Sequence, residues 1–384
     1  MLWLGYCATD CATGLRMPAP RRFFPIDVSP LATSCTVAET FRVLQLNMLA
    51  DGLSGLRDDL GAFSRARAED LSWDTRKAQL LYEILQYAPD VITLQECDHY
   101  YDFFLPELSA MGYDGLFAPK PSSACLEVSE NSDGCVIFLK RGKFSVKSAE
   151  TLTFALAKGD CIECWDKEED RQVRAQNQVA LVALCDLRGE ENDQQQRQQL
   201  IICTTHLKAT KNIVGERTRN LEVTQLLSSV QSLFSAKVNA NGQEPLILIT
   251  GDLNAAPDER STGYQALAYS AVKQSSLDLR SVLNDDLCPR LEAEHGTAGA
   301  GGDIWTTWKA RRKQGKESVS KSCIDYILYR PLTEVARGKA GLRAKSVLGL
   351  FSEAEIGQDL LPSDRYPSDH LAIAADLEVV FVKP

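Results

Sequence analysis

The chain has 384 residues, of which 44% are hydrophobic and 24% charged, so it is long enough to bury a substantial core. Its net charge is −10 and its pI is about 5.1. Proteins that hold long polyanions carry basic surfaces, so this balance argues against a stable complex with nucleic acid. No apolar run reaches the length of a membrane span, and no internal repeat is visible.

The first 40 residues differ in composition from the rest. They are rich in proline and poor in acidic residues, and they include Arg16, Arg21 and Arg22. This composition is typical of a disordered leader or of a mitochondrial presequence, so residues 1–40 are predicted to be one or the other. The protein is accordingly expected in the cytoplasm, in the mitochondrion or in both.

The chain contains twelve cysteines without a regular spacing. We interpret them as reduced thiols. Cys161 and Cys164 form one CxxC pair, but a zinc site needs further ligands and none is obvious nearby.

From residue 41 onward, apolar segments predict alternating strands and helices. Helical spacing is visible in Ser72–Tyr87, which Pro89 ends, and in Glu216–Phe234. Short apolar runs predict the strands Phe41–Leu46, Val91–Leu94, Val136–Leu139, Val179–Cys185, Leu200–Cys203, Leu246–Ile249, Ile324–Leu328 and Leu371–Val380. Three polar stretches between them are expected to be surface loops: Glu190–Gln199, Glu292–Gly302 and Arg312–Lys321. No linker interrupts the series, so residues 41–384 are predicted to form one catalytic domain.

Polar side chains follow several of these strands at the point where each strand ends. Asn47 follows the first strand, Glu96 follows Val91–Leu94, and His206 follows Leu200–Cys203. A layered α/β protein gathers its site from such strand ends. A carboxylate there, such as that of Glu96, needs a charged partner or a bound cation.

Three further groups have the same placement. Asp252 and Asn254 lie two residues apart after a fully apolar strand, where they can face one pocket. Asp369 and His370 precede the last strand, and this pair suits proton transfer near neutral pH. Asp325, at the start of another strand, is the type of carboxylate that fixes a histidine tautomer.

Together these motifs resemble the exonuclease–endonuclease–phosphatase superfamily. They read LN at 46–47, QE at 95–96, TH at 205–206, GDLN at 251–254, IDY at 324–326 and SDH at 368–370. Gln95–Tyr101 (QECDHYY), Phe117–Leu126, Asp133–Phe138, Thr306–Lys309 (TTWK) and the tail Ser346–Leu371 are similar to one branch of that superfamily. The resemblance implies a four-layer α/β sandwich, in which two packed mixed β-sheets are flanked by helices.

The resemblance also implies roles for these residues. Mg²⁺ would be held by Glu96 with Asn47 nearby, and Asp369 would bind a second ion or support the first. Asp252 would orient and activate the water, and Asn254 would hold the phosphate. His206 and His370 would stabilise charge at phosphorus, with Asp325 behind His370. Since no cysteine or serine serves as a nucleophile in these motifs, direct attack by water is expected.

Resemblance to that branch of the superfamily implies that the enzyme removes the 2′-phosphate of NADP⁺ and NADPH. The protein is expected to be a monomer. Lys120, Lys208 and Arg311, together with Asn47, are the matching pocket positions, and Lys211 stands where this branch has an arginine. Two alternatives remain. One is a 3′-exoribonuclease that shortens poly(A), which the acidic net charge disfavours. The other is a non-catalytic adaptor, which the complete set of motifs disfavours.

Overall fold

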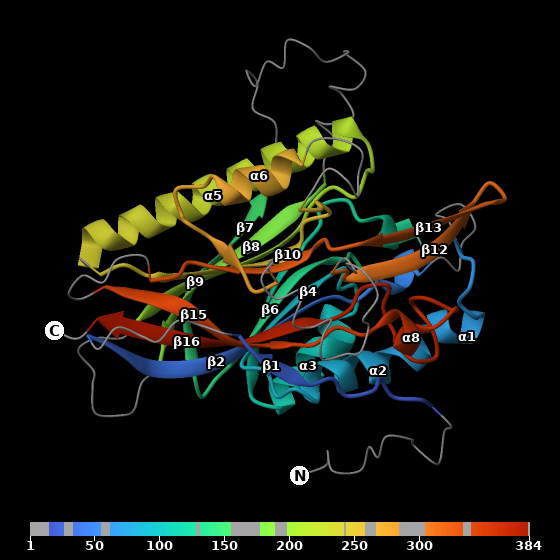
Figure 1. Cartoon of the computed structure of the whole chain (residues 1–384), viewed down its shortest axis with the longest axis horizontal. Coiled ribbons are helices and arrows are strands. Elements are labelled where there is room, and N and C mark those ends of the chain that lie inside the picture. Colours follow the sequence, from blue (N-terminus) through green and yellow to red (C-terminus); the bar gives the residue numbers. More distant parts are fainter. Residues whose placement is uncertain are drawn as a thin grey trace.

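The computed structural model describes residues 15–26, 34–54, 62–127, 131–154, 177–188, 198–241, 243–257, 266–283, 304–332 and 339–382. Two β-sheets lie face to face, with helices on both outer sides (Figure 1). The first sheet has seven strands, in the order β1 (Phe23–Pro25), β15 (Ala340–Leu348), β16 (Ile373–Val382), β2 (Cys35–Asn47), β4 (Val91–Gln95), β6 (Gly134–Lys140) and β5 (Tyr113–Pro119).

The second sheet has six strands, in the order β11 (Arg280–Ser281), β14 (Asp325–Tyr329), β10 (Leu246–Asp252), β9 (Gln199–His206), β8 (Val179–Leu187) and β7 (Phe144–Thr153). Both sheets are mixed, because β2 runs parallel to β4 and β9 runs parallel to β10 while their other pairs are antiparallel. A smaller sheet consists of β13 (Lys316–Ser322), β12 (Thr307–Lys313) and β3 (Ala62–Phe63).

Helices cover the outer face of each large sheet (Figure 1). The six-stranded sheet is covered by α5 (Ile213–Asn241) and α6 (Leu267–Lys273), and the seven-stranded sheet by α2 (Trp73–Leu85), the π-helical turn Tyr100–Phe104 and α3 (Leu105–Ala110). Short helical segments complete the fold: η1 (Asp51–Leu53), α1 (Ala68–Leu71), η4 (Ala124–Glu127) and α8 (Glu353–Ile356). The predicted four-layer sandwich is therefore confirmed. No helix in the described residues is both long and apolar enough to cross a bilayer.

The apolar strands alternate between two cores, as a period of two along a strand requires. In β10, Leu246 and Leu248 pack between the sheets, whereas Ile247 and Ile249 pack under α5 and α6. The unbroken run Leu246–Ile249 is thus explained by a strand that is buried on both faces. The helix α5 contributes Val223, Leu226, Leu227 and Val230 to its side of this core, at helical spacing.

The predicted boundary at residue 40 is wrong for part of the leader. Within residues 15–26, β1 pairs with β15, and the buried guanidinium of Arg21 forms an ion pair of 2.5 Å with Glu83. The strand β2 already begins at Cys35. These contacts join segments more than 60 residues apart, which composition does not reveal. Residues 1–14 and 27–33 lie outside the described residues, and the destination of the N-terminus stays a prediction.

The predicted loop Arg312–Lys321 is also wrong, because it forms the hairpin of β12 and β13. Its turn residues Gln314 and Gly315 have φ of 50° and 75°, the left-handed pair that a two-residue hairpin turn needs. Cys161 and Cys164, residues 190–197 and residues 292–302 lie outside the described residues. Cys35, Cys97, Cys135, Cys185 and Cys203 are free thiols, as expected.

Candidate active site

The sheet topology brings the polar strand ends to one edge of the sandwich. Asn47 is paired in register with Gln95, so Glu96 follows directly beside it. In the opposite sheet, Asp252 is paired with His206 on one side and with Asp325 on the other. The motifs that are farthest apart in sequence therefore meet because neighbouring strands end together.

A buried hydrogen-bond network joins the two sheets just behind this edge. The Gln45 amide donates to Gln95 at 2.6 Å and to Asp325 Oδ1 at 3.2 Å. The Gln95 amide in turn donates to Thr204 of the other sheet at 2.9 Å. Because these groups are shielded from water, breaking one bond would leave a buried polar atom unsatisfied, and this holds the strand ends in register.

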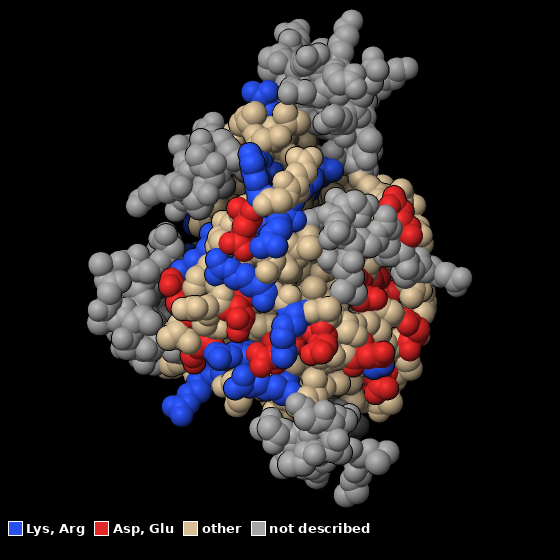
Figure 2. Space-filling view, turned by 90° about the vertical axis from the view of Figure 1, so that its right-hand side faces the viewer, with Lys and Arg blue, Asp and Glu red and all other residues tan. Residues whose placement is uncertain are grey.

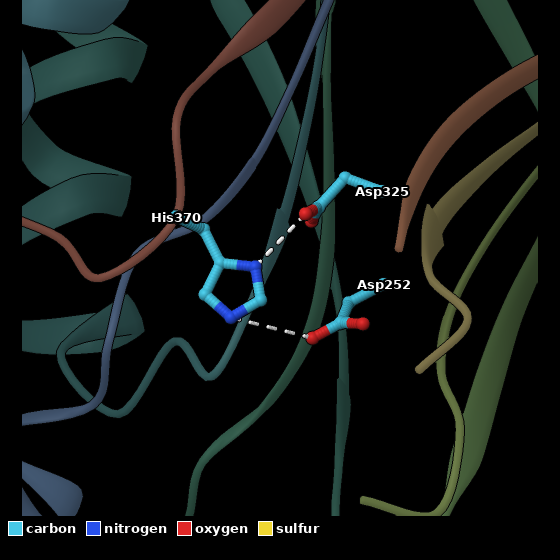
Figure 3. A group of neighbouring side chains, drawn as sticks. All are labelled: Asp252, Asp325 and His370. Atoms are coloured by element: carbon cyan, nitrogen blue, oxygen red, sulfur yellow. Dashed lines mark hydrogen bonds and ion pairs between the residues drawn. The ribbon is translucent and has the colours of Figure 1, made fainter. Parts of the chain in front are cut away.

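His370 lies between two carboxylates (Figure 3). Its Nδ1 is 2.9 Å from Asp325 Oδ2, and its Nε2 is 3.8 Å from Asp252 Oδ2. Burial alone would lower the pKa of His370, but the carboxylates of Asp325, Asp369 and Asp252 together outweigh it, and the pKa rises to about 9. His370 is therefore a cation at neutral pH, and its Nε2 faces the site.

Both carboxylate oxygens of Asp325 accept hydrogen bonds. Its Oδ2 accepts hydrogen bonds from His370 and, at 2.5 Å, from Thr306, and its Oδ1 accepts one from Gln45. Asp252, Asp325 and His370 lie close enough together to hold a metal ion. Because both Asp325 oxygens are already occupied, this group is better suited to orienting and charging the imidazole than to binding a cation.

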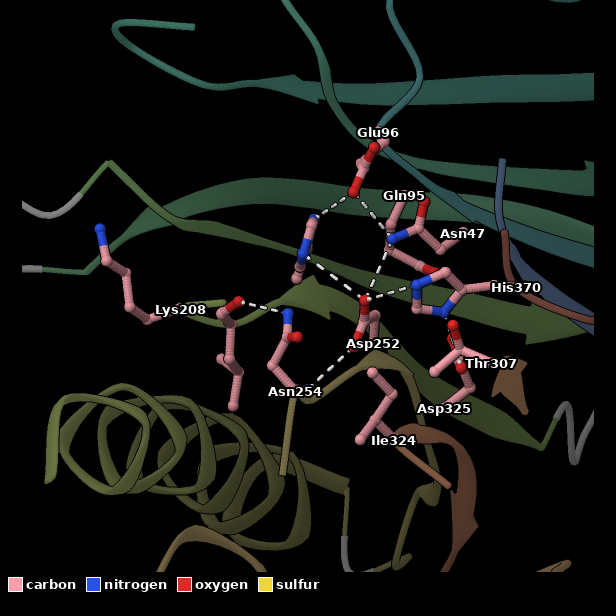
Figure 4. Close-up of polar contacts among 12 residues, drawn as sticks. Asn47, Gln95, Glu96, Lys208, Asp252, Asn254, Thr307, Ile324, Asp325 and His370 are labelled. Atoms are coloured by element: carbon pink, nitrogen blue, oxygen red, sulfur yellow. Dashed lines mark hydrogen bonds and ion pairs between the residues drawn. The ribbon is translucent and has the colours of Figure 1, made fainter. Parts of the chain in front are cut away.

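The carboxylates of Glu96 and Asp252 converge on the side-chain amide of Asn47 (Figure 4). The amide nitrogen of Asn47 donates to Glu96 Oε1 and to Asp252 Oδ2, both at 3.0 Å. Two carboxylate oxygens around one donor form an arrangement that a hard divalent cation fits. Glu96 adopts a left-handed φ of 55°, which turns its side chain out of the strand direction and toward this point. Asn47 presents its amide nitrogen here as a hydrogen-bond donor, and its predicted role beside the metal stays a prediction.

His206 and Asn254 close the site around Asp252. His206 Nε2 is 3.6 Å from Asp252 Oδ2, and its Nδ1 is 3.9 Å from Glu96 Oε1. Burial lowers the pKa of His206 to about 4, so its imidazole is neutral at neutral pH. The backbone nitrogen of Asn254 donates to Asp252 Oδ1 at 2.8 Å, and its side-chain amide donates one proton to Leu207 O at 3.0 Å, which leaves the second amide proton for a ligand.

Several cations surround the carboxylates. Lys120 forms an ion pair of 2.6 Å with Asp133, and although burial lowers its pKa, Asp133 and Glu96 raise it more. The pKa of Lys211 is lowered, first by burial and then by Lys309, although Asp252 counteracts this effect. Lys211 is solvent-exposed but close enough to Lys309 and Asp252 for their charges to act on it, and its role in substrate binding stays a prediction. Lys208 is half-buried, and its described contacts are made by its backbone.

Asp369 is held by cations rather than turned toward Glu96. Its Oδ2 is hydrogen-bonded to Lys309 and lies 3.9 Å from Arg311 Nη2, and the Arg311 guanidinium stacks on Phe63. Burial raises the pKa of Asp369, but Lys309, His370 and Arg311 together bring it well below its usual range. Asp369 Oδ2 thus neutralises the cations of β12, whereas Oδ1 is buried and has no hydrogen-bond partner among the described residues. The predicted metal role of Asp369 stays a prediction.

Two further residues of the site, Lys309 and Thr306, were not predicted from the sequence. Lys309 Nζ lies 3.3 Å from His370 Nε2, and Thr306 fixes Asp325. Both belong to TTWK, and Thr307 forms a β-bridge with His370. Figure 2 looks onto this end of the molecule, where lysine and arginine side chains gather beside acidic ones, and Arg312, Lys313 and Lys316 of the hairpin are exposed. The signal in the sequence was the alternation of cations in Trp308–Lys313.

Comparison with known proteins gives consistent results. The model of the Endonuclease/Exonuclease/phosphatase family matches residues 44–370. Nocturnin from Homo sapiens is 32% identical over 370 residues, which cover 96% of this chain and 72% of the relative, and nocturnin from Xenopus laevis is 34% identical over 343 residues, 88% of this chain and 72% of the relative. The human nocturnin catalytic domain, solved with a bound sulfate anion, superposes with a TM-score of 0.60 at 28% identity, covering 94% of this chain and 97% of that one.

Proposed function

Because the chain belongs to the endonuclease/exonuclease/phosphatase family, whose enzymes are metal-dependent hydrolases, we propose that it is a Mg²⁺-dependent phosphatase that removes the 2′-phosphate of NADP⁺ and NADPH. The observation that carries the proposal is the convergence of these groups on one oxygen of Asp252. Asp252 Oδ2 accepts a hydrogen bond from Asn47, which also donates to Glu96, and it lies 3.8 Å from Nε2 of His370, whose Nδ1 faces Asp325. The products would be NAD⁺ or NADH and inorganic phosphate.

Glu96 would hold the ion, with Asp252 beside it and Asn47 orienting both carboxylates. When bound, Mg²⁺ supplies positive charge to the phosphoryl oxygens and lowers the pKa of a bound water. Oxygen ligands of this kind match the preference of Mg²⁺, and the two carboxylates are otherwise close enough to repel each other.

Asp252 would accept the proton of the attacking water. Burial raises the pKa of Asp252, and Asp325 adds to this effect, while His370, His206 and Asn47 oppose it. A carboxylate whose pKa is raised is a stronger base and is better matched to neutral pH than a solvated one. His370 would face the phosphoryl group as a cation, and the neutral His206 and the second amide proton of Asn254 would donate further hydrogen bonds.

The substrate class is supported by the placement of the cations. Lys120, Lys211 and the β12 residues Lys309 and Arg311 bring positive charge to the carboxylates of the site from three separate segments, whereas the chain as a whole is acidic. A compact ligand with several phosphates suits such a local field better than a long polyanion does. The sulfate bound to the human relative is also a tetrahedral dianion.

A poly(A)-specific 3′-exoribonuclease remains the second candidate, because the same chemistry cleaves phosphodiesters. The exposed cations Arg312, Lys313 and Lys316 at the hairpin tip are the feature that favours it. A non-catalytic adaptor is disfavoured, since the carboxylates, amides and imidazoles lie within interaction distance of one another.

The proposal is tested by identifying the products. We expect NADPH incubated with the protein and Mg²⁺ to yield NADH and inorganic phosphate in equal amounts, detected by chromatography and ³¹P NMR. Release of nicotinamide or of AMP in place of phosphate would place the cleaved bond elsewhere and would refute the proposal. Glu96→Gln is the matched control, because it removes one charge and keeps the side-chain volume.

A further inference from the structure

Two arginines are buried behind the site and belong to helices on opposite outer faces of the sandwich. Arg76 of α2 is 0% exposed and Arg219 of α5 is 1% exposed. Burial of a guanidinium costs several kcal/mol of folding free energy unless its N–H groups find hydrogen-bond acceptors. Both arginines direct donors to backbone carbonyls of the loops that carry site residues, which distinguishes them from the solvated cations of the surface.

Arg76 joins two loops that enter the site from the seven-stranded sheet. Its Nη1 donates to the carbonyls of Met48 at 3.1 Å and Leu49 at 2.8 Å, directly after Asn47. The same nitrogen donates at 3.2 Å to the carbonyl of Pro367, in the loop that carries Asp369 and His370. One side chain thus links the strand end beside Glu96 to the loop of His370.

The turn held by Arg76 is strained. Leu49 has a φ of 59°, a conformation that a leucine rarely adopts and that costs about 1 kcal/mol or more. Its backbone nitrogen donates to Asn47 Oδ1 at 3.1 Å, and its carbonyl accepts from Arg76. The orientation of the Asn47 amide, and with it the donor between Glu96 and Asp252, therefore depends on this turn.

Arg219 holds a different loop, the one that carries Lys208 and Lys211. Its Nη1 donates to the carbonyls of Lys208 at 2.7 Å and Thr210 at 2.8 Å. Its Nε and Nη2 are bound to Glu216, and Glu222 accepts from the Lys208 backbone nitrogen at 2.9 Å. The peptide groups on both sides of Lys208 are thus fixed to α5.

The start of α5 lies unusually close to this loop. A Cβ at Gly215 would lie 2.0 Å from the carbonyl oxygen of Thr210, so only glycine permits the approach. The Leu207 backbone is fixed from the other side, where its carbonyl accepts from Asn254 and its nitrogen donates to Asp252 O at 3.0 Å. The loop is therefore positioned between α5 and the strand end that carries Asp252.

We propose that Arg76 and Arg219 are positioning residues that divide the site between them. Arg76 fixes the groups that perform the chemistry, and Arg219 fixes the loop whose lysines bind the phosphates of the substrate. The assignment of the Lys208 loop to substrate binding rests on the proposed function. A purely structural role would lower the stability of the chain and would reduce kcat and kcat/KM together, without a division between the two arginines.

The kinetic test compares Arg76→Met with Arg219→Met. Misplacement of reacting groups by about 1 Å lowers turnover by roughly 100-fold, so Arg76→Met is expected to lower kcat by about 10- to 100-fold and to leave KM within about twofold. Arg219→Met is expected to raise KM by about tenfold and to leave kcat within about twofold. Lys77→Met and Arg217→Met, the neighbours on the same helices, are the matched controls and should resemble the unaltered chain.

Amide hydrogen exchange tests the positioning without any activity. Arg76→Met should speed exchange in peptides covering residues 48–54 and 365–371, and Arg219→Met should do so in residues 207–212, with the other loop unchanged in each case. If a methionine variant does not fold, Arg76→Lys or Arg219→Lys, which keeps the charge, replaces it. Each lysine variant should speed exchange in the same loop as the methionine variant, by a smaller factor, and leave the other loop unchanged.

The outcomes separate this inference from the proposed function. If both variants change kcat and KM alike and exchange rises throughout the chain, the arginines are structural only and the inference is overturned. If the unaltered chain releases no phosphate from NADP(H), the proposed function fails. The exchange result then still decides whether each arginine holds its own loop.

Discussion

Asp325→Asn tests the charge state of His370 most sharply. The substitution keeps the size of the side chain but removes the negative charge 2.9 Å from Nδ1. Without that charge, the pKa of His370 should fall from about 9 to its ordinary value near 6.5 or below, since burial lowers it. At about pH 7.5 the protonated fraction then falls from ~97% to ~9%, so the rate should drop at least about tenfold.

The assay is the pH dependence of phosphate release between about pH 5.5 and pH 10. The unaltered chain should lose activity as pH rises through about 9, because His370 loses its proton there. In Asp325→Asn the loss should move by two or more pH units to lower pH. Thr306→Val, which removes the hydroxyl donor to Asp325 but not the charge, should move it much less. An unchanged alkaline limb in Asp325→Asn would refute the assignment of charge to His370.

Three further predictions concern stability, metal binding and substrate affinity. Burial raises the pKa of Glu222 to about 7, so the folded state loses stability as pH rises from about 4.5 to 7. Glu222→Gln should therefore raise the free energy of unfolding at pH 8 by up to about 3 kcal/mol, and leave it unchanged at pH 4. Thermal melts at both pH values test this, and an equal Tm of the two proteins at pH 8 would contradict it. Glu96→Gln should abolish the rise in Tm that Mg²⁺ gives, and an undiminished rise would place the ion elsewhere. Lys120→Ala and Arg311→Ala should raise KM about tenfold with little change in kcat, as measured in steady-state assays. Unchanged KM values would show that these two residues do not bind the substrate's phosphates.

The sequence allowed the layers and most of the site to be predicted because both depend on local patterns. Strands buried on both faces appear as unbroken apolar runs such as Leu246–Ile249, and each is followed by the polar residue that it delivers to the site. Asn47, Glu96, His206 and Asp252 could be placed in this way. Neighbouring strands end at the same edge, so positions that are distant in sequence were predicted to converge, and they do.

The features that could not be predicted depend on contacts between distant segments. Arg21 looks like part of a presequence until its ion pair with Glu83 is known. The contact between Asp369 and Lys309, 60 residues apart, is not visible in the sequence. The hairpin of β12 and β13 turns on Gln314-Gly315, which lacks the Asn-Gly or Asp-Gly signature that marks such turns in a sequence. In each case the structure depends on contacts or turn geometry that the local sequence pattern does not show.

The most direct test of the proposed function is a comparison of two substrates with one preparation of the protein. Phosphate release from NADPH and NADP⁺ and shortening of a 3′-labelled poly(A) oligonucleotide would be measured in parallel, with Mg²⁺ and with EDTA. We predict metal-dependent phosphate release and no shortening of poly(A). Shortening of poly(A) without phosphate release from either dinucleotide would contradict the proposal and would assign the cations around Asp252 to an RNA backbone.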